Sequence, residues 1–157
     1  IQGENFTVKV TDGKIVSLRF DGKEYLKTPL EPNYFRALID NDFSLTNFVP
    51  FLIPLHPYYT WRTATDTAQG TITAIDEGAN GEIIIYVDWA VFSFSGVKSK
   101  YIIYPDGKIE VNHEGTPKAF TLLRFGTQMG LIPELNYVKW YGRGPQETYM
   151  TVKPAAK

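Results

Sequence analysis

The stretch Phe6-Thr-Val-Lys-Val-Thr-Asp-Gly-Lys-Ile-Val-Ser-Leu-Arg-Phe20 decides the fold class of this chain. In its first half, Phe6, Val8 and Val10 alternate with polar residues, which is the two-residue period of a half-buried strand. Asp12-Gly13 follows as a hairpin signal, because glycine admits the positive φ that tight hairpin turns need. The stretch therefore predicts two antiparallel strands joined by a short turn.

The second half of the stretch extends this pattern. Val16, Leu18 and Phe20 alternate with polar residues and are predicted to share one face. Asp21-Gly22 then repeats the turn signal before residues 24–26. The opening of the chain is predicted to be a β-meander.

Strand-like segments continue through the rest of the sequence, and no window of a dozen residues shows a helical period with caps. Trp89 lies within an apolar segment and is predicted to be a core residue. We predict an all-β antiparallel β-sandwich of nine or ten strands. The later predicted strands are 71–76, 83–94, 97–104, 108–114, 121–131 and 137–141.

Residues Phe43 to Tyr59 depart from this pattern, because they combine three prolines with many apolar side chains and no alternation. The segment is predicted to be a long loop, and long loops in compact domains are usually functional or cover something. Two interpretations are open at this stage. The loop either folds over the domain's own core or faces a partner domain or a ligand pocket.

The bulk composition is that of a soluble globular protein. The chain has 157 residues, 43% of them apolar, with a net charge of −1 and no cysteine. We expect one domain at residues 1–152 and a frayed tail at 153–157. The charge balance gives no reason to expect nucleic acid or a membrane as partner. Because the chain begins at Ile1 without a leader, we expect a processed or excised piece, and either a cytoplasmic or a periplasmic location fits.

Some residues have side chains suited to catalysis or metal binding. Asp40 and Asp42 flank Asn41, a spacing that suits a Ca²⁺ ligand pair, although a turn in which these side chains cap their own backbone is the favoured interpretation. His113 continues an apolar strand face and is predicted to be packed rather than to bind a metal. His56 has no evident partner in the sequence.

Glu147 is the best single carboxylate for acid–base chemistry, because a Gly-Pro turn constrains it. A glycosidase needs two acids across a cleft, and no second acid stands in a similar setting. Arg143 beside Glu147 suggests a structural ion pair or a bond to backbone carbonyls. We therefore expect this chain to contain no catalytic residue and no metal site.

Two dense motifs resemble the small-chain domain of the β-galactosidases of glycoside hydrolase family 2. The first motif is Asn33-Tyr-Phe-Arg-Ala-Leu-Ile-Asp-Asn-Asp42, with Trp61-Arg62 resembling the end of the loop that follows it. Leu38 stands where the family commonly has proline. The second motif is Val138-Lys-Trp-Tyr-Gly-Arg-Gly-Pro-Gln-Glu-Thr-Tyr149, in which Thr148 replaces the usual asparagine. Phe125 and residues 128–131 resemble the strand that precedes it.

The resemblance implies a sandwich of the galactose-mutarotase-like (supersandwich) superfamily, truncated after the second motif. It places the two catalytic glutamates, and the Mg and Na ions that the family often uses, in a (β/α)₈ barrel outside this chain. It therefore implies a non-catalytic accessory segment of a β-galactosidase, with the barrel, neighbouring domains and a galactoside as partners. The entrance or structural residues implied are Arg36, Asp40, Asn41, Asp42, Trp61, Trp140, Arg143 and Glu147.

Two alternatives belong to other functional classes. A free-standing carbohydrate-binding module would use Trp61 or Trp140 as a stacking platform for sugar. A mutarotase-like epimerase would need a paired acid and base in one cleft, for which the two histidines and Glu147 are the candidates. A binding module would hold sugar alone, whereas an accessory segment would neither bind nor react without its barrel.

Overall fold

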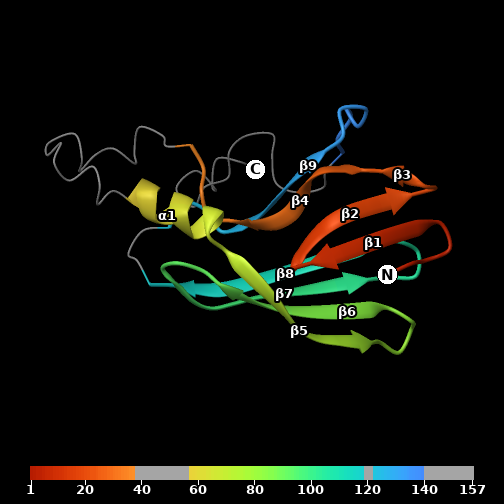
Figure 1. Cartoon of the computed structure of the whole chain (residues 1–157), viewed down its shortest axis with the longest axis horizontal. Coiled ribbons are helices and arrows are strands. Elements are labelled where there is room, and N and C mark those ends of the chain that lie inside the picture. The colour runs from red at the N-terminus through yellow and green to blue at the C-terminus, as the bar shows by residue number, and fades with distance from the viewer. Residues whose placement is uncertain (38–56, 119–121, 140–157) are drawn as a thin grey trace, which may run out of the picture.

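Nine β-strands and one short helix make up the part of the chain that the computed structural model describes, residues 1–37, 57–118 and 122–139. The strands form two antiparallel sheets that lie face to face, with the helix at one end (Figure 1). This arrangement confirms the predicted all-β antiparallel sandwich.

The first sheet contains the β-meander predicted from the opening residues. Its strands follow the order β1-β2-β4-β9, and β3 pairs with β2 beside this path. The last strand, β9, comes from a distant part of the sequence and pairs antiparallel with β4. The bounds are β1 Phe6–Thr11, β2 Lys14–Phe20, β3 Lys23–Glu24, β4 Leu26–Asn33 and β9 Gly126–Leu131.

The second sheet follows the sequence order β5-β6-β7-β8, so every neighbouring pair is a hairpin. It provides the larger share of the buried core, including Trp89 as predicted. The core residues of both sheets point into the space between them. The bounds are β5 Gln69–Glu77, β6 Ile83–Ala90, β7 Phe94–Ile103 and β8 Ile109–Pro117.

A β-bulge in β2 shows that the face predicted for Val16 is wrong. Lys9 pairs with Ser17, but Val10 pairs with Ile15, so Val16 is an extra residue in the ladder. The inserted residue reverses the alternation, which places Ile15 in the core instead of Val16. The predictions for Leu18 and Phe20 are confirmed, since both pack against the core.

Three predicted strands are wrong in extent. Of the segment 121–131, only β9, Gly126–Leu131, is a strand among the described residues. The segment 83–94 is not one strand, because β6 ends at Ala90 and the chain turns at 91–93, where Ser93 has a φ of 62°. No Gly or Pro marks this turn in the sequence. The strand predicted at 137–141 is absent from residues 137–139, and Tyr137 and Val138 are strongly exposed there.

Helix α1, Pro57–Asp66, contradicts the prediction of a chain without helices and of a loop reaching Tyr59. It begins at a proline, which is tolerated in a first turn because its missing N–H is not needed there. Trp61 and Ala64 are fully buried, and Thr65 completes the same face at the i, i+3, i+4 spacing. With its ten residues, α1 is too short to give a clear helical period in the sequence.

Glu24 anchors the turn from β2 into β4. Its Oε1 accepts hydrogen bonds from the backbone N–H groups of Leu18 at 2.9 Å and Leu26 at 3.1 Å, and its Oε2 accepts one from the Ser17 hydroxyl. Burial opposes its ionisation, but these bonds and one from Arg19 prevail and lower the pKa of Glu24 to about 2. The carboxylate therefore stabilises the fold in its charged form.

We expect Glu24→Gln to lower the free energy of unfolding by about 1–3 kcal/mol, because an amide nitrogen cannot accept the bonds that an ionised oxygen accepts. The folded pKa lies below the ordinary 4.5, so this stabilisation is present above pH 4.5 and is lost as pH falls toward 2. Urea unfolding at several pH values measures both effects. Glu4→Gln at an exposed position is the control, and an equal loss there would contradict the assignment.

Candidate functional site

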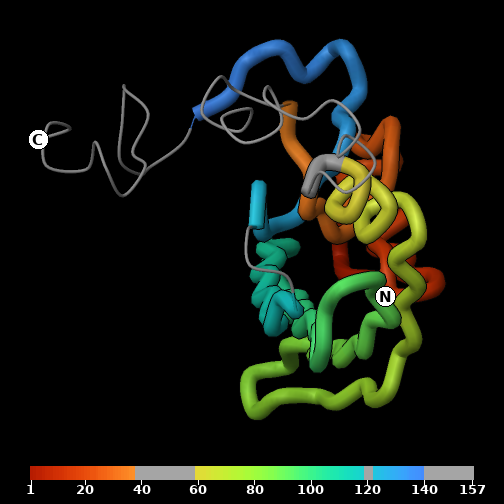
Figure 2. The backbone as a smooth tube through the Cα atoms, turned by 90° about the vertical axis from the view of Figure 1, so that its left-hand side faces the viewer, coloured from red at the N-terminus to blue at the C-terminus, as the bar shows by residue number. Residues whose placement is uncertain are grey.

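Five rings from five segments meet at the α1 end of the sandwich, and we call this cluster the aromatic corner. It lies where the residues after β4 pass beside the helix (Figure 2). The Tyr34 ring lies 4.5 Å from Phe94 and 5.8 Å from Phe125, centroid to centroid. Its members are Tyr34, Trp61, Phe94, His113 and Phe125.

Tyr34 is the centre of the corner and is fully buried. Its backbone N–H donates to Thr65 Oγ1 at 2.9 Å, and the Thr65 hydroxyl donates to the Trp61 carbonyl at 3.1 Å. One hydroxyl thus ties the end of β4 to α1. Tyr34 was missed in the sequence, where its position between two motif residues was the available signal.

A chain of polar groups runs from the corner into the second sheet. Tyr34 Oη lies 3.0 Å from His113 Nε2, and His113 Nδ1 lies 2.8 Å from Ser99 Oγ. Trp89 Nε1 donates to the same Ser99 oxygen at 2.9 Å. Both ring nitrogens of His113 are therefore satisfied by hydroxyls that accept or donate, which suits a neutral imidazole.

Burial of these polar groups favours their neutral forms. Burial lowers the pKa of His113 to about 4, although a hydrogen bond with the Lys98 backbone opposes the shift. Burial likewise raises the pKa of Tyr34 well above its usual value, and that of Tyr101 to about 12. His113 is packed, as predicted, and its ring stacks 4.9 Å from Phe125. The arrangement is a satisfied structural network and not an acid–base pair.

We expect His113 to make folding sensitive to acid. Its folded pKa of about 4 lies below the ordinary 6.5, so the unfolded chain takes up the proton first as pH falls. The free energy of unfolding should fall between pH 6.5 and 4 by on the order of 2 kcal/mol from this group. Urea unfolding of the native chain and of His113→Gln measures the difference. Identical slopes over this window would contradict the prediction.

The first motif docks on the segment around β9. Arg36 Nε donates to the Leu123 carbonyl at 3.1 Å, and Arg36 Nη1 donates to the Ala37 carbonyl at 3.0 Å. The Asn33 amide donates to Gln128 Oε1, and Asn33 Oδ1 accepts from the Phe35 N–H at 2.8 Å. Arg36 therefore bonds two backbone carbonyls. Segments about ninety residues apart meet here.

Trp61 is placed differently from the surface position that a stacking platform requires. Its side chain is 0% exposed and its ring lies 5.1 Å from Phe94. Trp89 is also buried and bonded to Ser99. Neither indole presents a face to solvent, so neither is a sugar-stacking platform.

The other predicted site residues lie outside the described part of the chain. The structure therefore leaves their roles as predictions, and the same holds for the loop after the first motif up to residue 56. These residues are Asp40, Asn41, Asp42, His56, Trp140, Arg143 and Glu147.

Within residues 1–37, 57–118 and 122–139, no three His, Asp or Glu side chains are grouped to hold a metal ion. Every buried side-chain nitrogen and oxygen in these ranges has a hydrogen-bond partner, so none is left pointing at a missing ligand. The described helix is too short and too polar to cross a membrane. The aromatic corner joins the end of β4, α1, β7 and β8 through ring contacts and hydrogen bonds.

Comparison with known proteins agrees with the two motifs. The family model described as β-galactosidase small chain matches residues 2–157. The chain belongs to the β-galactosidase small-chain family. In this chain, the Asn33 amide of the first motif bonds Gln128 of β9, and Arg36 bonds the Leu123 carbonyl just before that strand. The aromatic corner thus connects Tyr34 of the first motif with Phe125, which lies just before β9.

Several curated β-galactosidases are similar to this small-chain domain. That of Halalkalibacterium halodurans is 26% identical over 157 residues, covering 95% of this chain. That of Priestia megaterium is 26% identical over the whole chain, and that of Clostridium acetobutylicum is 29% identical over 93% of it. The small-chain domain spans about 15% of the length of these relatives.

Proposed function

We propose that this chain is a non-catalytic segment of a longer β-galactosidase, in which it braces the catalytic (β/α)₈ barrel and shapes the entrance to its active site. The whole enzyme hydrolyses terminal non-reducing β-D-galactose with retention, using two carboxylates and any Mg or Na ions of the barrel. The observation that carries this proposal is the match of the whole chain to about 15% of each relative, all of them β-galactosidases.

An open side of the sandwich supports a docking role. Between β8 and the first sheet, aliphatic side chains of β2, β4 and β8 line a crevice of about 200 Å³, with Met129 of β9 at the surface. In the described residues β9 is an edge strand, so its outer backbone groups are available for further pairing. The lining residues are Ile15, Leu18, Leu26, Leu30, Ile109, Val111 and Met129.

Exposed apolar side chains continue from this crevice along the chain, and we call them the apolar margin. Tyr137 is 83% exposed, and Met129 is 50% exposed. These exposed apolar side chains lie on β9 and in the residues that flank it, and exposed apolar patches mark contact sites in soluble proteins. The remainder of the parent polypeptide is the partner that we assign to it. The apolar margin comprises Leu122, Phe125, Met129, Tyr137 and Val138.

The alternatives have less support. A sugar-binding module cannot use Trp61 as its stacking platform, because that indole is buried. The other candidate, Trp140, lies outside the described residues. An epimerase would need His113 as an acid or base, yet both of its nitrogens are held by hydroxyls and its pKa is low. An accessory segment requires neither group to act on a sugar.

We expect Val138→Asp to destabilise the full-length enzyme, because a carboxylate buried in an apolar interface costs about 2–5 kcal/mol. The same change in the isolated chain should have little effect, since Val138 is 65% exposed there. Thermal unfolding and nitrophenyl-galactoside hydrolysis of the full-length enzyme measure the loss. Ile75→Asp, at a side chain that is 62% exposed on β5, is the matched control. Equal tolerance of both changes would contradict the docking role.

A further inference from the structure

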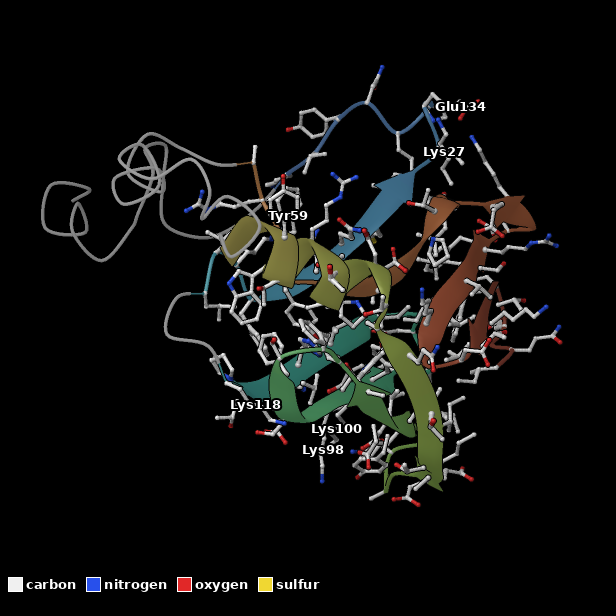
Figure 3. All side chains as sticks on the ribbon, turned by 60° about the vertical axis from the view of Figure 1, so that its left-hand side comes forward. Lys27, Tyr59, Lys98, Lys100, Lys118 and Glu134 are labelled. Atoms are coloured by element: carbon white, nitrogen blue, oxygen red, sulfur yellow. The ribbon has the colours of Figure 1, made fainter. Side chains whose placement is uncertain are left out.

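A groove of about 750 Å³ crosses the second sheet, on a surface that the proposed docking role does not use. Part of its lining alternates along β6, β7 and β8, so these side chains leave the face of the sheet opposite to the core: Tyr86, Asp88, Lys98, Lys100, Asn112 and Glu114. The intervening Val87, Ser99 and His113, with Thr73 and Ala74 of β5, complete the lining. Lys98 and Lys100 mark this side in Figure 3, directed away from the first sheet. The volume lies within the range of about 300–1,000 Å³ typical of small-molecule sites.

Two cross-strand rows form the floor of the groove. In the first row Lys98 stands between Asp88 and Glu114, its partners on the neighbouring strands. In the second row Lys100 stands between Tyr86 and Asn112, with Lys100 Nζ 5.8 Å from the centre of the Tyr86 ring. All of these residues line the groove.

The charges and hydrogen-bonding groups of the lining favour one class of ligand. Two lysines and two carboxylates leave it without formal net charge, so it does not favour an anion or a cation. Ammonium groups donate, carboxylates accept and the Asn112 amide does both, which matches the hydroxyls of a sugar. The half-buried Tyr86 adds one aromatic surface among these polar groups, and sugars present apolar C–H faces to such rings.

We propose that this groove binds a neutral oligosaccharide. Tyr86 contacts a pyranose face, Lys100 and Asn112 hold its hydroxyls, and the Asp88–Lys98–Glu114 row binds the adjoining sugar unit. The site is separate from the buried tryptophans and shares no residue with the apolar margin. It also stands apart from the hydrolytic reaction proposed above, so its failure would leave the accessory role intact.

The test uses the ¹⁵N-labelled chain titrated with β-1,4-galactotriose, cellotriose or trigalacturonic acid. We expect saturable shifts of the Lys98, Lys100 and Asn112 amides with at least one neutral trisaccharide, at roughly millimolar affinity. These shifts should persist when the salt concentration is raised, because the ligand has no charge to screen. Tyr86→Ser should weaken binding by about tenfold or more, as expected for the loss of one aromatic contact.

Tyr104→Ser is the matched control, because Tyr104 also has a lysine over its ring, Lys108 at 4.5 Å, and does not line the groove. Binding by this variant should equal that of the native chain. If Tyr86→Ser fails to fold, Lys100→Met takes its place with the same expected weakening. The proposal is overturned if neither neutral trisaccharide shifts these amides, if Tyr86→Ser binds as well as the control, or if binding is confined to the acidic sugar.

Discussion

Gly13→Ala is expected to lower the free energy of unfolding by about 2–4 kcal/mol, because strain and a steric clash act together. Gly13 has a φ of 74° in the turn between β1 and β2, a conformation that costs energy in a residue with a side chain. A Cβ built there lies 2.4 Å from Val87 Cγ1 in the buried centre of β6. The turn cannot retreat freely, because the Tyr101 hydroxyl donates to the Gly13 carbonyl at 2.8 Å.

Gly22→Ala provides the control for this prediction. Gly22 also follows an aspartate in a hairpin turn and has a φ of 77°, yet nothing lies within 4 Å of its added Cβ. It should lose only the conformational part, about 1 kcal/mol. Chemical denaturation of both variants separates strain from packing. Equal losses in the two variants would show that the turn does not press on the second sheet.

Trp61→Ala is expected to cost about 3–5 kcal/mol, because it removes a fully buried indole and leaves a cavity between α1 and the sheets. The loss should spread to the aromatic corner, since the Trp61 ring packs on Phe94, which in turn packs on Tyr34. Urea unfolding measures the free energy, and the His113 ring protons report whether the corner loosens.

Thr63→Ala is the control on the same helix, because Thr63 is exposed and alanine is a better helix former. We expect a change within about 0.5 kcal/mol for this variant. A loss below about 1 kcal/mol for Trp61→Ala would mean that the indole is not packed as described.

The parts of the fold that follow local rules were predictable from the sequence. Strand β1 and its turn follow from alternation and an Asp-Gly pair, and the paired strands lie where these signals predict. The burial of Trp89 follows from its apolar neighbours. These features depend on residues that are close together in the sequence, so a single sequence displays them directly.

The errors have physical causes that a single sequence hides. The bulge at Val16 shifts the alternation without any glycine to mark it, and the turn at 91–93 has no breaker residue. Helix α1 gains its stability from burying Trp61 against Phe94 more than from its own sequence. For α1, a tertiary contact overrides the local pattern.

The candidate site was predictable only in part. The position of His113 on an apolar face indicated packing, but its partners Tyr34 and Ser99 lie 79 and 14 residues away. The junction between Arg36 and Leu123 spans 87 residues and has no sequence signal other than the family resemblance. Such long-range contacts depend on how the two sheets pack, so they could not be predicted from local sequence patterns.

We propose that this chain supports catalysis without performing it. The most direct measurement is nitrophenyl-galactoside hydrolysis by the isolated chain, by the remainder of the full-length polypeptide, and by the two mixed. We expect no hydrolysis by the chain alone, impaired hydrolysis by the remainder, and recovery of hydrolysis on mixing. Hydrolysis by the chain alone, or a remainder as active and stable as the full-length enzyme, would contradict it.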